Sequence, residues 1–285
     1  MRIRDVPELL LASRWISGPR IEDAIKITHR FNKRGAHGMI NFLGEGNKSK
    51  TQVTKTVDEY ILLLKEIKKS RINACISIKP TQIGLLIGCN EAIKNYSKIV
   101  EYAKKYHIDV WLDMEEYQYV NSTIKIYYTK IKYPNTGICI QSYLKRSIND
   151  VQKISLAGGR IRLVKGAYKE SRSISYPKRA LSTKNYVLLM EYLFKNSKNF
   201  IIATHDINMV SKAKQLSKIY NNRKFSYAML CGIRNKDAIK LALAGNNVYI
   251  YIPYGTQWIK YAKRRLKEMS NLKLIIRSLF SMQTI

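Results

Sequence analysis

The chain has 285 residues, 46% of them hydrophobic, a composition that predicts a folded globular protein and excludes a mostly disordered one. Its 51 Lys and Arg residues outnumber the 20 Asp and Glu residues and give a formal net charge of +31. No apolar run approaches the roughly 20 residues of a membrane-spanning helix, and the apolar run near the N-terminus is too short for the core of a signal peptide, so we expect an intracellular, cytoplasmic protein.

Eight short runs rich in β-branched and aromatic residues recur along the chain, as expected of strands that are covered on both faces. Each is followed by a longer segment, such as VDEYILLLKEIKK or NYSKIVEYAKKY, whose apolar residues are spaced three and four apart like those of an amphipathic helix. The strand-like runs are GMINFLG (38–44), ACISIK (74–79), DVWLDME (109–115), TGICIQSY (136–143), GRIRLVKG (159–166), FIIATHD (200–206), KFSYAML (224–230) and NVYIYIP (247–253).

This alternation of strands and helices predicts an α/β fold of the (β/α)8, or TIM-like, barrel type. A doubly wound open sheet is the alternative, but it rarely needs eight such regular units. We expect a single domain over residues 1–285, with N-terminal helices over 1–36, the barrel over 37–270 and a C-terminal helix over 271–285.

The spacing of the cysteines and the distribution of charge argue against several classes of function. The four cysteines form no CxxC pair, so zinc and thioredoxin-like chemistry have no support and we expect reduced, packed thiols. The large positive charge attracts polyanions. Because the basic residues are spread along helical segments, the pattern favours solvated helix faces or an anionic membrane surface over nucleic acid.

Polar or aromatic side chains close the predicted strands one after another. In a (β/α)8 barrel the C-terminal strand ends form the face where chemistry occurs. The residues at these ends are Glu45, Lys79, Asp113, Gln141, Arg162, Lys165, Tyr168, Thr204, His205, Leu230 and Tyr251.

The segment after the last strand, YIPYGTQWIKYAKRRLKE, adds Tyr261, Arg264 and Arg265. Residues three and four apart share one helix face, so both arginines lie on the face of Tyr261. Guanidinium groups bind carboxylates and phosphates through paired hydrogen bonds. Together with Lys79, which Asp113 is placed to pair with, these arginines predict a pocket for a small molecule that carries a carboxylate.

A second ligand is indicated by Gln141, Arg162 and Lys165, which are the kinds of group that contact a nucleotide-bearing cofactor. The chain contains neither GxGxxG nor GxxxxGK[ST], which argues against Rossmann and P-loop binding. Asp113 and Glu115 could form a carboxylate pair for glycosidic chemistry, although on a strand they would lie only two residues apart on one face. No metal cluster is indicated.

Two other functional classes remain open from the residues alone. A Schiff-base aldolase could use Lys79 or Lys165 as its nucleophile. A nucleic-acid-binding module would place exposed aromatic residues among basic ones on one face. The tyrosines instead gather at strand ends or in apolar runs, which ranks that reading last.

Seven motifs taken together resemble the successive motifs of the proline dehydrogenase family. They are SIKPTQIG, LDMEE, IQSYLKRS, RLVKGAY, ATHD, AMLCGIR and YIPYGTQWIKYAKRRLKE, and their order and spacing match from Gly38 to about residue 270. The resemblance implies a (β/α)8 barrel that binds FAD, rather than FMN, without a Rossmann domain. It also implies oxidation of L-proline to Δ1-pyrroline-5-carboxylate by hydride transfer to flavin N5.

The same resemblance implies roles for individual residues. The catalytic set would be Lys79, Asp113 and Arg162. The substrate would be bound by Lys79, Tyr168, Leu230, Tyr251, Tyr261, Arg264 and Arg265. The cofactor would be held by Asp113, Gln141, Arg162, Lys165, Gly166, Ala167, Thr204 and His205. The chain departs from many family members on the seventh strand, where Ser226, Tyr227 and Ala228 replace Glu-Phe-Gln, so the resemblance assigns no cofactor contact on that strand.

The resemblance further implies that electrons pass to a quinone-type acceptor. A peripheral location on the inner face of the cell membrane would fit this acceptor, the net charge and a tail helix that carries Lys273 and Arg277. The tail could equally cover the barrel or form an oligomer contact.

Overall fold

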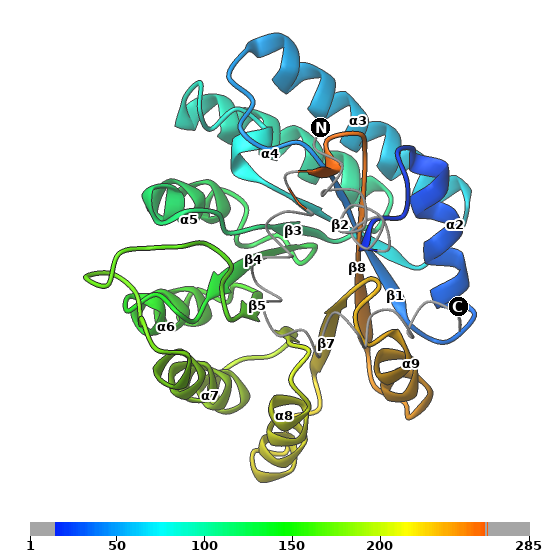
Figure 1. Ribbon diagram of the computed structural model, residues 1–285. Coiled ribbons are helices and arrows are strands. Elements are labelled where there is room, and N and C mark those ends of the chain that lie inside the picture. The colour runs from blue at the N-terminus through cyan, green and yellow to red at the C-terminus, as the bar shows by residue number, and fades with distance from the viewer. Residues whose placement is uncertain (1–14, 260, 262–285) are drawn as a thin grey trace, which may run out of the picture.

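The computed structural model describes residues 15–259 and 261, and within them eight parallel strands close into a barrel in chain order, with the last strand paired to the first. Figure 1 shows this ring of strands with helices around it. The strands are β1 (His37–Phe42), β2 (Ala74–Ile78), β3 (Val110–Leu112), β4 (Thr136–Gln141), β5 (Ile161–Val164), β6 (Phe200–Ala203), β7 (Phe225–Leu230) and β8 (Val248–Tyr254). The prediction of a (β/α)8 barrel is confirmed.

Helices alternate with the strands and cover the outside of the barrel (Figure 1). They are α2 (Ile21–Asn32), α3 (Lys50–Lys69), α4 (Cys89–Lys105), α5 (Val120–Tyr128), α6 (Ser147–Leu156), α7 (Arg179–Asn196), α8 (Ile207–Ile219) and α9 (Asn235–Leu243). Two short 3₁₀ turns, η3 (Pro80–Gln82) and η4 (Tyr117–Tyr119), follow β2 and β3.

Helix α3 illustrates how the sequence specifies these elements. Its cap is Ser49, whose hydroxyl accepts a hydrogen bond from the Gln52 backbone N–H at 3.3 Å, while the Gln52 side chain accepts one from the Ser49 N–H. This reciprocal pair satisfies two backbone donors that a helix start leaves open. Val53, Val57 and Tyr60 are buried at helical spacing, so the apolar stripe faces the barrel.

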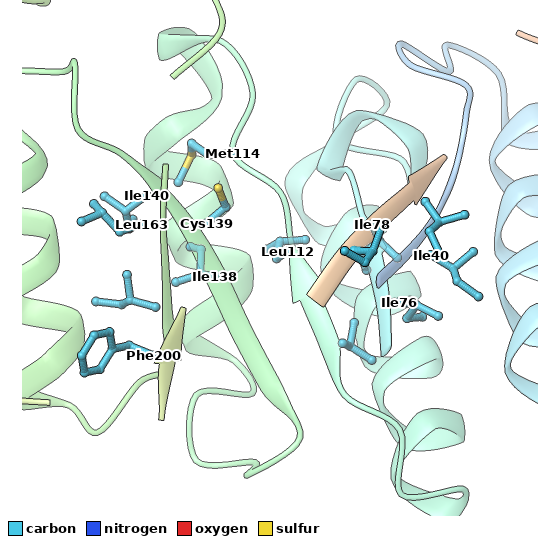
Figure 2. Close-up of a cluster of buried hydrophobic side chains, with 14 of the residues drawn as sticks. Ile40, Ile76, Ile78, Leu112, Met114, Ile138, Cys139, Ile140, Leu163 and Phe200 are labelled. Carbon is cyan, nitrogen blue, oxygen red and sulfur yellow. The ribbon is translucent and has the colours of Figure 1, made fainter. Parts of the chain in front are cut away.

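The hydrophobic core has two layers, one on each side of the barrel wall. The outer layer lies between strands and helices, and Figure 2 shows part of it, including Ile76, Leu112 and Ile138. The inner layer fills the barrel with Met39, Cys75, Trp111, Ile201 and Ala228. Because successive strand residues point to opposite faces, Trp111 faces inward while its neighbours on β3 face outward. The barrel is therefore packed, and ligands must bind at its ends.

Helix α2 packs beside β1 and β8, where it buries Ile21, Ala24, Thr28 and Phe31. Just before it, the backbone N–H of Ser17 donates to the Pro253 carbonyl at 2.9 Å. Beyond β8, Tyr261 is buried with Trp15 and with two residues that follow strand ends, Leu43 and Ile233. The start of the described chain and Tyr261 thus meet at the C-terminal end of the barrel, which we call the upper rim.

The remaining fold-level expectations have different outcomes. All four cysteines carry free thiols, and three of them, Cys75, Cys139 and Cys231, are buried, as predicted. Among the described residues no helix is both long and apolar enough to cross a membrane. The domain limits stay a prediction, since residues 1–14, 260 and 262–285 lie outside the described residues.

Candidate active site

One carboxylate at the upper rim joins two cations. Asp113 directly follows β3, and its Oδ2 accepts a hydrogen bond from Lys79 Nζ at 2.7 Å. Its Oδ1 is bound by the guanidinium of Arg162, from β5. The hydroxyls of Ser77 and Tyr251 donate to the same carboxylate at 2.6 and 2.9 Å. The predicted pairing of Lys79 with Asp113 is confirmed, and the strands β2, β3, β5 and β8 all contribute to the cluster. We call these five residues the Asp113 cluster.

The Asp113 cluster is dry and carries a net positive charge. The side chains of Lys79, Asp113 and Arg162 are no more than 8% exposed. Burial by itself would raise the pKa of Asp113, but the charges of Lys79 and Arg162 outweigh it and hold that pKa well below its usual range. Burial would lower the pKa of Lys79, but Asp113 raises it well above its usual value. Within the five residues of the cluster, two cations therefore face one anion at neutral pH. Glu45 also raises the pKa of Lys79, and the charge of Lys79 acts on the nearby Glu115.

Aromatic rings fix the guanidinium of Arg162. Its central carbon lies 5.9 Å from the centre of the Trp111 ring and 5.7 Å from that of Tyr251. Its two terminal nitrogens each lie 3.3 Å from the Ser77 hydroxyl oxygen. A cation held over ring faces and by a carboxylate has little rotational freedom. Arg162 is thus pre-positioned at the mouth of the barrel.

Glu115 lies only two residues after Asp113 but is held differently. Its carboxylate accepts hydrogen bonds from the Thr81 N–H at 2.9 Å and the Thr81 hydroxyl at 2.7 Å. Burial raises the pKa of Glu115 to about 7, because the nearby Lys79 charge offsets only part of the burial effect. The Gln141 side chain donates to the Glu115 backbone carbonyl at 2.7 Å. The two carboxylates therefore have separate partners, which is unlike the matched pair of a glycosidase.

The aromatic and apolar residues expected near the substrate gather at the same rim. The phenol of Tyr168 is close enough to Lys79 to contribute to its raised pKa. The phenol of Tyr261 likewise contributes to the raised pKa of Tyr251, after burial and the Asp113 charge. Leu230, at the end of β7, packs against the small cluster that contains Tyr261. The structure thus brings Tyr168, Tyr261 and Leu230 to the Asp113 cluster, which itself contains two more of the expected substrate-side residues, Lys79 and Tyr251. Arg264 and Arg265 lie outside the described residues.

The cofactor-side candidates form an arc along the ends of β4, β5 and β6. Lys165 follows β5 and pairs with Asp206 at 3.3 Å between Nζ and Oδ2. His205 follows β6, and its Nε2 accepts a hydrogen bond from the Leu230 N–H at 2.8 Å, which ties the end of β6 to the end of β7. Thr204 is buried, and its hydroxyl accepts a bond from the Asp206 N–H at 3.1 Å.

Gly166 and Ala167 lie on the loop after β5, beside this arc. The backbone of Gly166 has a φ of +108°, and a Cβ built there would lie 2.0 Å from the Tyr143 ring. Only glycine meets both conditions without strain. The loop therefore runs close against Tyr143, and the Gly166 backbone is exposed at the rim.

Two functional contacts escaped the reading of the sequence. Ser77 bonds both Asp113 and Arg162, and Thr81 holds Glu115. The sequence did contain a signal for Ser77. It lies two residues before Lys79, and residues two apart on a strand point to the same face, so both side chains face the same side of β2. The same alternation places the residues of β7 that depart from the family pattern. Tyr227 faces the outer core, and Ala228 lies in the barrel interior.

Comparison with known proteins finds similar sequences over most of the chain. The model of the family described as proline dehydrogenase matches residues 24–273. Proline dehydrogenase 1 of Bacillus subtilis (strain 168) is 32% identical over 260 residues, 90% of this chain and 86% of that protein. A proline dehydrogenase of Deinococcus radiodurans is also 32% identical, over 268 residues and the same shares of the two chains.

A solved structure shows the same fold. Proline utilization A from Bdellovibrio bacteriovorus, inactivated by N-propargylglycine, has a TM-score of 0.86 at 20% sequence identity, over 97% of this chain and 34% of that one. This chain thus spans about a third of the length of that protein. The family match over most of the chain and the identity to two relatives establish that the chain belongs to the proline dehydrogenase family.

Proposed function

We propose that this chain oxidises L-proline to Δ1-pyrroline-5-carboxylate with a flavin as the oxidant. The observation that carries the proposal is the Asp113 cluster, in which Lys79 and Arg162 share one buried carboxylate at the upper rim. Membership of the proline dehydrogenase family supports the same reaction.

The excess positive charge of the cluster suits a substrate that carries a carboxylate. Lys79 stays protonated because its pKa is raised, so it can donate to a carboxylate oxygen as well as to Asp113. An ion pair formed in a water-poor site is stronger than the same pair in water. We therefore assign Lys79 to the proline carboxylate, together with Arg264 and Arg265, which the sequence places after β8.

Positioning is the main contribution that these residues can make. Holding the carboxylate at one end of proline fixes the ring carbon at the other, and such orientation can supply on the order of 7–11 kcal/mol of a barrier. Leu230 and the tyrosines at positions 168, 251 and 261 would enclose the apolar ring and exclude water. Asp113 would act as the residue that orients Lys79 and Arg162 rather than as a base, because its depressed pKa makes it a weak proton acceptor.

The arc on β4 to β6 fits a flavin. Hydrogen-bonding groups of the kind that contact the ring, the ribose and the phosphates come from Gln141, Arg162, Lys165, Thr204 and His205. Gly166 supplies exposed backbone, and the half-buried Ala167 adds no bulky side chain. Alanines at register-paired positions, Ala203 on β6 and Ala228 on β7, add only methyl groups beside this arc. When bound, the flavin would accept a hydrogen and two electrons from the ring carbon beside the nitrogen, and the nitrogen would release its proton, as the C–N bond becomes C=N. We assign FAD rather than FMN, and Arg162 to the edge of its ring.

The aldolase hypothesis does not fit the same geometry. A Schiff-base lysine must lose its proton at working pH, which requires a lowered pKa. Lys79 has the opposite shift, and it is held by Asp113 at 2.7 Å. Lys165 is also paired, with Asp206.

The electron acceptor, location and assembly are further parts of the proposal. We propose a quinone-type acceptor and a cytoplasmic chain that associates peripherally with an anionic membrane surface, supported by the net charge of +31. An oligomer is compatible with this arrangement, and a single domain over residues 1–285 is proposed.

Anaerobic spectroscopy with purified protein tests the proposal. The chain, reconstituted with FAD, should hold the flavin, and addition of L-proline should bleach the oxidised flavin band. Lys79→Met should keep the flavin but raise the proline concentration needed for half-maximal bleaching by about tenfold or more. The matched control, Lys195→Met, removes an exposed lysine of α7 and should behave like the wild type. A colourless protein, or a flavin that proline leaves oxidised, would overturn the proposal.

A further inference from the structure

The opposite end of the barrel, which we call the lower rim, contains a cavity that the proposed reaction does not use. Its volume is about 480 Å³, within the range of small-molecule sites. It is lined by residues that precede strands β5 to β8, among them Arg160, Asn199, Lys224 and Asn247. The upper rim lies at the other ends of these strands, so this cavity is separate from the candidate active site.

The lining of the cavity is cationic. Arg160, Arg223 and Lys224 all contribute to it, and Asp109 is bound to Arg160 at 2.6 Å. Among the described residues, Arg223 and Lys224 have no carboxylate within ion-pair distance. Both side chains are exposed, so the cavity presents two hydrated positive charges that form no ion pair with the described residues.

Helix geometry does not account for these two charges. Every α-helix from α2 to α9 carries a basic residue in its last turn, where the helix dipole favours a cation. Arg223 and Lys224 instead lie four and five residues beyond the end of α8, just before β7. The dipole effect is confined to the last turn, so it does not account for the position of these two exposed cations.

The cavity is a rigid, built feature rather than a gap between mobile loops. The Asn199 N–H donates to the Lys224 carbonyl at 2.7 Å. The Asn222 side chain donates to the carbonyls of Phe194 and Ser197 at 2.9 and 2.8 Å. These bonds tie the loop before β6 to the loop before β7, and they hold the backbone that carries Arg223 and Lys224.

Arg160 forms the fixed floor of the cavity. Its guanidinium donates to the Pro134 carbonyl and to Asp109, each at 2.6 Å, and its central carbon lies 5.2 Å from the centre of the Trp111 ring. Its Nε is buried and has no hydrogen-bond partner among the described residues. A buried donor without a partner is costly, but because this nitrogen is shielded from solvent it is not available to a ligand in the cavity.

We propose that this lower cavity binds a phosphate monoester group. A phosphate monoester carries about two negative charges near neutral pH, which matches the two exposed cations. Guanidinium groups bind phosphate oxygens in pairs. The cavity is also larger than a phosphate ion needs, and Phe225 and Tyr249 supply an aromatic wall for the organic part of the ester.

Calorimetric titration of the full-length chain tests this site without relying on enzyme activity. Phenyl phosphate should bind with one-to-one stoichiometry and more tightly than inorganic phosphate. The double variant Arg223→Ala, Lys224→Ala should weaken binding by about tenfold or more, because it removes two charge-assisted contacts. The control Lys195→Ala, Lys240→Ala removes the same charge from exposed helix ends outside the cavity and should bind like the wild type.

A second experiment, with lipid vesicles, tests whether the phosphate monoester belongs to a lipid headgroup or to a water-soluble molecule. Binding to phosphatidic acid vesicles, but not to phosphatidylcholine vesicles, that depends on Arg223 and Lys224 would support the site and assign the ester to a lipid headgroup. Phenyl phosphate binding without vesicle binding would support it and assign a water-soluble ester. The proposal is overturned if neither probe binds, if inorganic phosphate binds as tightly as phenyl phosphate, or if both double variants lose affinity equally.

Discussion

The two ends of strand β3 carry the same pair of residue types in different surroundings. Asp109 precedes the strand and binds Arg160 at the lower rim, while Asp113 follows it and binds Arg162 at the upper rim. Trp111 lies between them in the chain, with both guanidiniums within 6 Å of its ring centre. The side chains of the lower pair are 21% and 27% exposed, against 5% and 8% for the upper pair.

The difference teaches that burial, and not the identity of the residues, decides what an ion pair does. The lower pair keeps contact with water, so its partners lose little if they separate. The upper pair is dry and shared with Lys79, so each member depends on the others for compensation. The same residue types therefore give a structural contact at one end and an electrostatically tuned cluster at the other.

The largest difference in unfolding free energy between the two rims should come from neutralising Asp113 at the upper rim and Asp109 at the lower rim. Asp113→Asn leaves the buried Lys79 and Arg162 without their counter-charge and should lower the free energy of unfolding by about 3–5 kcal/mol. The matched variant Asp109→Asn, at the partly hydrated pair, should lower it by about 1 kcal/mol or less. Urea denaturation at pH 7 measures both. Equal losses would show that burial does not separate the two rims.

The pH dependence of stability isolates Glu115, the other buried carboxylate of the upper rim. Its pKa is about 7 in the folded chain against 4.5 for the ordinary side chain. A raised carboxyl pKa contributes stability that is fully present below about pH 4.5 and is lost as the pH rises through about 7, in total about 3 kcal/mol.

Glu115→Gln should therefore remove this loss, because the amide mimics the protonated acid towards Thr81. The difference in unfolding free energy between variant and wild type should shift in favour of the variant between pH 4.5 and 8. Glu191→Gln, at an exposed position of α7, serves as the control variant. A flat difference for Glu115→Gln would contradict the raised pKa.

Removing a single hydroxyl at a buried and at a partly hydrated hydrogen bond should give a smaller difference in unfolding free energy. Tyr251→Phe removes a 2.9 Å hydrogen bond to the buried Asp113 and should lower the free energy of unfolding by about 2 kcal/mol. Tyr254→Phe removes a 3.0 Å bond to Glu59, which is partly hydrated, and should cost about 1 kcal/mol or less. Both residues are tyrosines of β8, so thermal denaturation of the two variants compares the loss of one hydroxyl in each case. A larger loss for Tyr254→Phe would reverse the expected order.

The smallest effect is expected from the coupling within the lower pair. A double-mutant cycle with Asp109→Asn and Arg160→Met should give a coupling energy of about 1 kcal/mol or less. The corresponding cycle with Asp113→Asn and Lys79→Met should give a coupling of about 2–3 kcal/mol, since both side chains are dry. Comparable coupling energies in the two cycles would remove the distinction between the rims.

Much of the fold was readable from local patterns. Each strand is short and apolar enough to be covered on both faces, and helices such as α3 carry a cap and a regular buried stripe. A barrel also sends every strand end to one rim, so Lys79, Asp113, Arg162 and Tyr251 could be grouped in advance from their places in the chain. Their mutual hydrogen bonds, and the part played by Ser77, required the strand register.

The sequence by itself determined the order of eight strand and helix units, the inventory of cations, carboxylates and tyrosines at their ends, and the resemblance to one family, because these depend on residue type and spacing along the chain. Only the tertiary structure decided that Asp113 is shared by two cations while Glu115 turns to Thr81, and that a cationic cavity lies at the lower rim. Closure of the barrel brings residues from distant strands within hydrogen-bond reach and removes water from one rim more than from the other. That exclusion of water sets pKa values and ion-pair strengths, and it is not encoded in any single segment.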